Sequence, residues 1–269
     1  MTTWEMLTTS WTWDPSVIGG CIALTGLYLA AVHFQLNRKA VLFITGVLIM
    51  FLALESPLEA LGDTYLFSAH MLQHLLLILL VPPLLLLGLP RWLAELVLGW
   101  QPARQVERLL GRPLAAWLVE TGTVWVWHLP LLYNATLLNE QIHIVEHINF
   151  LITATIFWWP VLNPLAEKRI SPLATILYLF AAAASSSALG IILTFAPAGL
   201  YPPYLQPFDT LGILPLLRQQ WGLTPAVDQQ LGGLLMWVPG SLVYLSGIIG
   251  ALARWYGEPD EDRSQLYPA

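Results

Sequence analysis

The chain has 269 residues, of which 57% are hydrophobic and only 10% are charged. Soluble domains usually carry about 25% charged residues, so a soluble globular protein is excluded and an all-α, polytopic membrane protein is expected. The single cysteine, Cys21, excludes an internal disulfide and a cysteine-based zinc cluster. The net charge of −6 says less than how the charges divide between the two sides of a membrane, and no motif indicates nucleic-acid binding.

Apolar segments separated by charged and turn-forming residues predict seven transmembrane helices. In chain order, the predicted spans are 17–35, 40–54, 67–87, 114–132, 143–162, 172–195 and 231–254. Pro82 and Pro83 should kink the third span, because proline removes a backbone donor and clashes with the preceding turn. Segment 91–112 mixes arginine, glutamate, tryptophan and leucine, which is typical of an amphipathic surface segment. Residues 1–256 should therefore form one transmembrane domain, followed by a polar tail at 257–269.

Lysine and arginine predict the orientation, because they concentrate on the cytoplasmic side of membrane proteins. Of the eleven basic residues, only Arg218 falls on the opposite side from the rest in a seven-span arrangement. The N-terminus is therefore expected outside and the C-terminus, with the tail, in the cytoplasm.

Five of the six histidines fall at the predicted outer ends of spans. His70 and His74 open the third span, His128 lies near the end of the fourth, and His143 and His147 open the fifth. Each i, i+4 pair shares one helix face. Histidine at membrane depth is costly, and imidazole binds zinc, copper, iron and nickel. The sequence therefore predicts a metal centre with these five ligands, with a structural hydrogen-bond network and a proton relay as alternatives.

Four further residues are expected beside this centre or at its mouth: Glu146, Asp63, Asp228 and Met236. Glu146 shares a face with His143 and would ligate the metal, or orient or deprotonate a histidine. The two aspartates would attract cations or cap helices, and Met236 would face the site or pack. Met71 is expected to pack, because it points about 100° away from His70 on a helix.

His143, Glu146 and His147 also match the H-x-x-E-H pattern of one class of zinc peptidase. That chemistry needs a downstream acidic ligand. The downstream glutamates all fall on the predicted cytoplasmic side: Glu167, Glu258 and Glu261. The ligand set would then span the membrane, so a zinc hydrolase is the less favoured reading.

Five blocks carry a family resemblance: SPLEALGDTYLFSAHMLQHLLL (56–77), WHLPLLYNATL (127–137), HIVEHINFL (143–151), LTFAPAGLYPPY (193–204) and DQQLGGLLMWVPG (228–240). Together they resemble the CtaG family of multi-span cytochrome c oxidase assembly factors, which differs from the single-span copper chaperone of the same name. The resemblance implies a multi-pass protein of the bacterial plasma membrane that helps to mature a haem–copper oxidase. The family's HMxQH, WHxP and HxxEH histidines fall on the same five residues: His70, His74, His128, His143 and His147.

The expected function is therefore cytochrome c oxidase assembly, with copper bound at an outer-leaflet histidine site and zinc as the alternative metal. The expected partner is an oxidase subunit or a copper chaperone. Two alternatives stay open, a membrane-embedded zinc-dependent hydrolase and a haem-binding or structural scaffold protein. No catalytic residue is assigned.

Overall fold

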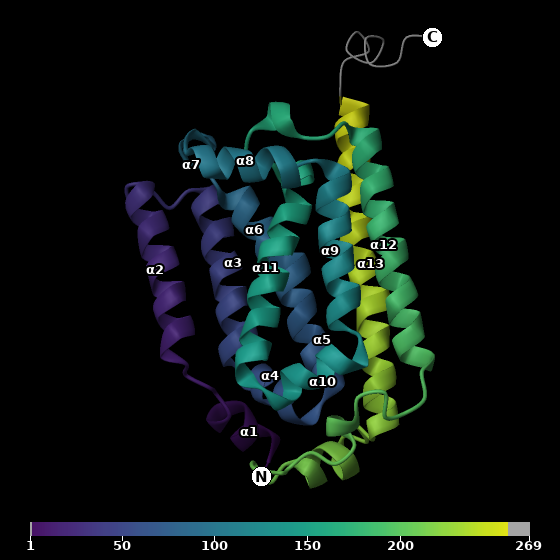
Figure 1. The fold of residues 1–269 in the computed structure, drawn as a ribbon. Coiled ribbons are helices and arrows are strands. Elements are labelled where there is room, and N and C mark those ends of the chain that lie inside the picture. The colour runs from purple at the N-terminus through teal and green to yellow at the C-terminus, as the bar shows by residue number, and fades with distance from the viewer. Residues whose placement is uncertain (1, 258–269) are drawn as a thin grey trace.

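The computed structural model describes residues 2–257, and every regular element in this range is helical. The predicted all-α class is confirmed. The long helices run side by side as a bundle (Figure 1). They are α2 (Pro15–Ala31), α3 (Arg38–Glu55), α9 (Pro113–Trp127), α11 (Glu140–Leu162), α12 (Pro172–Phe195), α13 (Pro225–Gly257) and a composite helix made of α5 (Phe67–Leu75), η2 (Leu76–Leu80) and α6 (Val81–Gly88). The predicted tail lies, apart from Gly257, outside the described residues.

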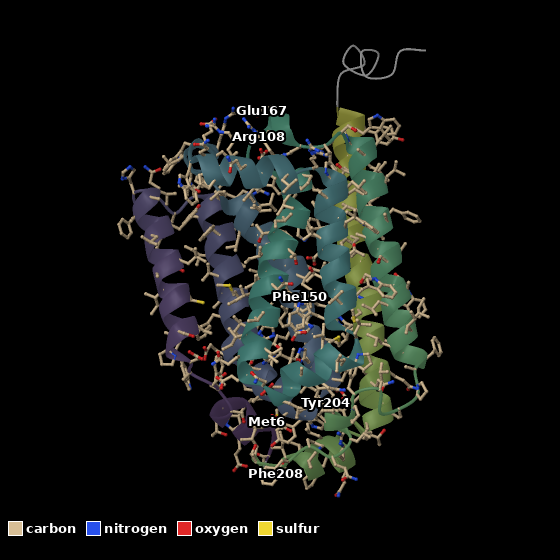
Figure 2. The ribbon with its side chains drawn as sticks, in the orientation of Figure 1. Met6, Arg108, Phe150, Glu167, Tyr204 and Phe208 are labelled. Atoms are coloured by element: carbon tan, nitrogen blue, oxygen red, sulfur yellow. The ribbon has the colours of Figure 1, made fainter. Side chains whose placement is uncertain are left out.

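Shorter elements close the two ends of the bundle. They are α1 (Thr3–Thr9), α4 (Pro57–Ala60), η1 (Leu61–Tyr65), α7 (Arg91–Gly99), α8 (Gln101–Leu110), α10 (Pro130–Leu138), η3 (Ala166–Lys168), η4 (Pro202–Tyr204) and η5 (Leu216–Gln220). α7 and α8 lie across the end of the bundle near Arg108 and Glu167 (Figures 1 and 2). An ion pair of 2.6 Å joins Arg91 to Glu167. Met6, Tyr204 and Phe208 lie at the opposite end (Figure 2).

Several helices are suited to a membrane. Within residues 2–257, four are long and apolar enough to cross it: Phe67–Gly88, Glu140–Leu162, Pro172–Phe195 and Pro225–Gly257. Arg38–Glu55 and Pro57–Tyr65, bent by 41° at their junction, add a fifth if they form one span. α2 is apolar but has 17 residues, and α9 has 15. The structure therefore describes a helical membrane protein with four or five candidate spans, where the sequence predicts seven.

The end of the fourth predicted span is wrong. It was expected to continue to Leu132, but α9 ends at Trp127 and His128 forms its C-cap. Leu129 is extended, with φ −63° and ψ 132°, because a following proline disfavours the helical conformation. Pro130 then begins the separate helix α10, so His128 lies at a helix end and not inside a span.

The start of the seventh predicted span is also wrong. It was expected at Leu231, but α13 begins at Pro225. The polar residues before Leu231 have partners: the Gln229 side-chain nitrogen donates to the backbone oxygens of Ala196 and Pro197, at 3.0 and 3.2 Å. Polar groups satisfied in this way can continue the helix beyond its apolar part.

The third span runs through its prolines as one helix, Phe67–Gly88. The π-helical turn η2, Leu76–Leu80, lies just before Pro82 and Pro83. Wider turns of this kind commonly accompany irregular hydrogen bonding in a helix. The helix thus continues through the prolines, with this wider turn just before them, and the predicted kink stays a prediction.

Asp228 fixes the start of α5, which has no capping side chain of its own. One Asp228 oxygen accepts from the backbone nitrogen of Phe67 at 2.8 Å, and the other accepts from that of Ser68 at 3.1 Å. This carboxylate on α13 thus supplies the N-cap that α5 lacks. It sets the position of the helical turn that carries His70.

Close packing of α12 on α13 follows from the small residues around Gly190. A Cβ atom added to Gly190 would lie 2.8 Å from the backbone oxygen of Gly233, a distance that a side chain cannot occupy. Small residues allow such close approach between membrane helices. This contact holds α13, and with it Asp228, against the rest of the bundle.

Candidate metal centre

Two helices supply the centre near the end of the bundle opposite α7 and α8. α5 carries His70 and His74, while α11 carries His143, Glu146 and His147, and all five side chains are buried. The side chain of Asn139 caps α11 by accepting from the backbone nitrogens of Gln141 and Ile142. The cap starts α11 early enough for its three polar residues to share the face toward α5.

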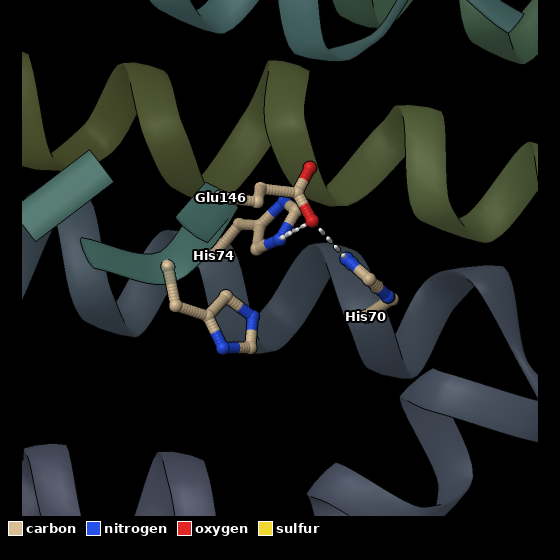
Figure 3. Close-up of side chains that lie close together, drawn as sticks. His70, His74 and Glu146 are labelled. Carbon is tan, nitrogen blue, oxygen red and sulfur yellow. Dashed lines mark ion pairs between the residues drawn. The ribbon is translucent and has the colours of Figure 1, made fainter. Parts of the chain in front are cut away.

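The inner group consists of His70, His74, Glu146 and His147. One possible ligand atom from each lies within 4.8 Å of all the others. Glu146 Oε2 is 3.5 Å from His70 Nε2 and 3.7 Å from His74 Nε2 (Figure 3). These distances exceed an ordinary hydrogen bond. They are close to the roughly 3.3–3.6 Å that separates two ligands of one tetrahedral metal ion.

Six polar atoms of this inner group have no hydrogen-bond partner. Both Glu146 oxygens, both His74 nitrogens, His70 Nε2 and His147 Nε2 are buried without a hydrogen bond. Buried polar atoms are normally hydrogen-bonded, and a cluster of exceptions needs an explanation. Lone pairs that face one another in an apolar interior are the donor set that a cation requires.

An outer group, Glu59, His143 and His147, leads from the inner group toward the surface. His143 Nδ1 is 3.8 Å from Glu59 Oε1 and 3.4 Å from Asp63 Oδ1. The Asp63 side chain is 44% exposed, whereas that of Glu59 is 17% exposed. The Gln73 side chain donates a hydrogen bond to the Glu59 carboxylate. Because His147 belongs to both groups, the groups form one continuous row of donors.

The other predicted site residues lie elsewhere. His128 belongs to neither group, and its ring centre is 6.0 Å from that of His74. Met236 is buried on α13 in the same apolar cluster as Met71. Asp228 caps α5. Among the described residues, the two groups thus contain four of the five predicted histidines, and the inner group also contains Glu146.

Tyr204, in the loop between α12 and α13, braces His70. Its hydroxyl donates to the backbone oxygen of Gly62 at 2.6 Å and lies 3.4 Å from His70 Nδ1. Burial raises the pKa of the Tyr204 hydroxyl well above its usual value, so the group keeps its proton. Because that proton is directed at Gly62, the Tyr204 oxygen faces His70 Nδ1 as an acceptor. A proton on Nδ1 leaves the Nε2 lone pair facing Glu146.

Sequence reasoning missed Glu59, Gln73 and Tyr204. All three lie in blocks 56–77 and 193–204, but neither their spacing nor their residue type marks these three positions. Glu59 and Tyr204 reach the centre through local geometry. A Cβ atom on Gly62 would lie 2.9 Å from the backbone nitrogen of His70, so η1 can cross α5 closely only because residue 62 is glycine.

The fold and the site define a class: a helical membrane protein with a buried centre of imidazole and carboxylate groups near one end of its bundle. Residues 26–258 match the family described as cytochrome c oxidase caa3 assembly factor. The chain belongs to that family, and the resemblance found in the sequence is confirmed.

Curated relatives are uncharacterized mycobacterial proteins. One from Mycobacterium leprae (strain TN) is 25% identical over 92% of this chain and 40% of its own length. Relatives from Mycobacterium bovis and Mycobacterium tuberculosis are each 24% identical over 92% of this chain and 39% of their own length. This chain therefore spans about two fifths of the curated relatives that it matches. No solved structure gives a significant match.

The first prediction concerns the Tyr204 hydroxyl. Tyr204→Phe should weaken Co²⁺ binding about tenfold, because groups that orient a metal-ligating histidine typically contribute about 10–100-fold to affinity. Titration of the detergent-purified protein, followed by the visible absorption of bound Co²⁺, measures the change. Tyr201→Phe is the matched control, since the Tyr201 hydroxyl donates to the backbone oxygen of His128, whereas the Tyr204 hydroxyl faces the His70 ring. Equal Co²⁺ affinities in the two variants would show that the Tyr204 hydroxyl does not contribute to metal binding.

Proposed function

We propose that this chain supports cytochrome c oxidase assembly by holding copper between His70, His74, Glu146 and His147. Family membership supports the assembly role. The observation that carries the metal proposal is the set of buried, unpartnered lone pairs that face one another within 4.8 Å. Three imidazoles and one carboxylate suit both copper and zinc, and the usual affinity order of divalent ions places Cu²⁺ above Zn²⁺.

The outer group would provide the route for the ion. Asp63 is exposed enough to meet an ion at the surface, and its carboxylate is 3.4 Å from His143. His147 would pass the ion inward by exchanging ligands, because it belongs to both groups. The partner at this mouth would be an oxidase subunit or a copper chaperone, which exchanges copper with His143 and Glu59.

We further propose seven spans, with the centre on the outer side of the bacterial plasma membrane. α2 and α9 would join the five longer candidates, because both are apolar and pack alongside them, α2 against α3 and α9 against α11. The orientation is supported by basic side chains at the α7 and α8 end, including Arg91 and Lys168. Cytoplasmic ends are enriched in such residues, so the N-terminus and the histidine centre would face outward.

The two alternative functions have less support. In the peptidase pattern the glutamate acts as a base beside the metal ligands, but here Glu146 is itself among the donor atoms, 3.5 Å from His70 Nε2. A haem would need a large cavity, and the cavity lined by His74 and His128 has a volume of about 40 Å³. The donor set and this small volume favour a bare metal ion.

Metal content tests the copper proposal. Purified wild-type protein should retain about one Cu²⁺ per chain, as expected for one four-ligand site. The double variant His74→Asn/His147→Asn should retain less than about a tenth of that, because two of four ligands are lost. Electron paramagnetic resonance, which detects Cu²⁺ and not Cu(I), gives the ratio after removal of loose metal. His33→Asn is the control: His33 is exposed and has a φ of 53°, which asparagine tolerates. Equal copper in the double variant and wild type would refute the site.

Orientation is tested by cysteine labelling in intact cells. In a Cys21→Ser background, Gln141→Cys on α11 should react with a membrane-impermeant maleimide from outside. Arg108→Cys on α8 should react only after the cells are opened. Both positions are exposed, so access and not burial decides the result. Labelling of both positions, or of Arg108→Cys alone, in intact cells would contradict an outward-facing centre.

A further inference from the structure

A second group of donors surrounds a small cavity beside the histidine centre. α5, η2, α9, α11, α12 and α13 line a cavity of about 40 Å³, and its lining includes Met71, Glu120, His128 and Met236. A water molecule needs roughly 10–15 Å³ measured in this way, so the space suits one ion or a few waters. All four of these side chains are buried.

The protonation of His128 can be read from its contacts. Its Nδ1 lies 2.6 Å from the backbone oxygen of Val124. A carbonyl oxygen can only accept, so Nδ1 carries the proton and Nε2 of the neutral ring carries a lone pair. Nε2 lies 3.3 Å from Met71 Sδ, and a thioether has no proton to donate. Two electron-pair donors therefore face each other across this gap.

That separation fits one shared ion. A nitrogen and a sulfur, each about 2.0–2.3 Å from a metal and 3.3 Å apart, subtend an angle of about 100° at it. Thioether ligands select Cu(I) among the common metal ions. Met236 offers a second thioether on the same cavity. A Cβ atom on Gly232, one turn earlier on α13, would lie 3.2 Å from Met71 Cγ, so the missing side chain lets α13 approach Met71.

Glu120 supplies the charge that a cation would need. Its side chain is 3% exposed, and neither carboxylate oxygen has a hydrogen bond. The hydroxyl of nearby Thr153 donates instead to the backbone oxygen of Asn149. Glu120 precedes His128 by eight residues, about 12 Å along α9, and so lines another part of the cavity. Once ionised beside a bound cation it would act through its charge and not as a ligand, since electrostatic attraction extends further in an apolar interior.

We infer that Met71, His128 and Met236 form a site for a soft monovalent cation of the Cu(I) class, with Glu120 as its counter-charge. The site is separate from the histidine–carboxylate centre, and His74 lines the same cavity. This inference extends the proposed function: one protein holds copper in two environments, a sulfur-containing one inside and an imidazole–carboxylate one toward the outer end. The ion stays Cu(I) in the site formed by Met71, His128 and Met236, so no electron transfer is required there.

Ag⁺ tests the inference, because it is soft, monovalent and does not change oxidation state. The chain with Cys21→Ser, which lacks the free thiol that would itself bind Ag⁺, serves as the background for all variants and is titrated in detergent with Ag⁺ alone and, separately, with Zn²⁺ alone. Met71→Leu/Met236→Leu should weaken Ag⁺ binding at least tenfold and remove the Ag–S signal from X-ray absorption, since it replaces the thioethers by apolar groups of similar volume. Zn²⁺ affinity should change by less than about twofold, because leucine keeps the volume of each methionine and no donor of the His70, His74, Glu146 and His147 group is removed. Met50→Leu on α3 is the matched control and should match wild type.

The outcomes separate the two proposals. Unchanged Ag⁺ affinity in the double variant, with Zn²⁺ still bound, overturns the soft site and leaves the histidine centre standing. Ag⁺ bound through sulfur without any Zn²⁺ or Cu²⁺ binding supports the soft site and refutes the histidine centre. If the double variant does not fold, the single variant Met236→Leu replaces it, and full Ag⁺ affinity there excludes Met236 as a ligand.

Glu120→Gln should lower Ag⁺ affinity in a folded protein, because it removes the negative charge beside the cation. Unchanged Ag⁺ affinity in this variant would show that Glu120 is not the counter-charge.

Discussion

The approach of Glu146 to the imidazoles of α5 is the constraint around which the structure is organised. A carboxylate and several imidazoles are buried among apolar helices, and their donor atoms have no hydrogen-bond partners. In an apolar interior this arrangement is costly unless a cation or protons offset it. The surrounding elements each hold one side of the cluster: Asn139 starts α11, Asp228 starts α5, Gly62 lets η1 cross above His70, and Tyr204 orients the His70 ring.

Local sequence patterns predicted much of the centre. The i, i+4 spacing of both histidine pairs placed each pair on one helix face, and Glu146 was assigned to the face of His143. These predictions needed only the geometry of a single helix. That α5 and α11 bring their faces together could not be predicted, because the order of helices in a bundle depends on contacts distant in sequence, such as Gly190 against Gly233.

The departures have local physical causes. His128 was grouped with the other histidines by its predicted depth, but Pro130 ends α9 and leaves the ring beside Met71. Met71 was expected only to pack, and it does pack close to Gly232, yet its sulfur also faces His128. Glu120 gave no sequence signal, because a lone glutamate in an apolar helix reveals its environment only when the neighbouring helices are in place.

Two kinds of donor thus lie within one bundle. Thioether and imidazole groups line the cavity between Met71 and Met236, while imidazole and carboxylate groups form the row that leads to Asp63. Thioether ligands favour Cu(I), whereas imidazole and carboxylate groups also suit Cu²⁺, so the two sets of donors suit copper in different oxidation states.

The most direct test of this account is the copper content of the oxidase itself. The oxidase is purified from a strain in which the gene for this chain is deleted and then replaced by either the wild-type gene or the His74→Asn/His147→Asn gene. The wild-type and variant chains are matched for their amount in the membrane. The account predicts a normal ratio of copper to haem with the wild-type chain and a copper-deficient oxidase with the variant. A fully copper-loaded oxidase in cells with the variant would contradict it.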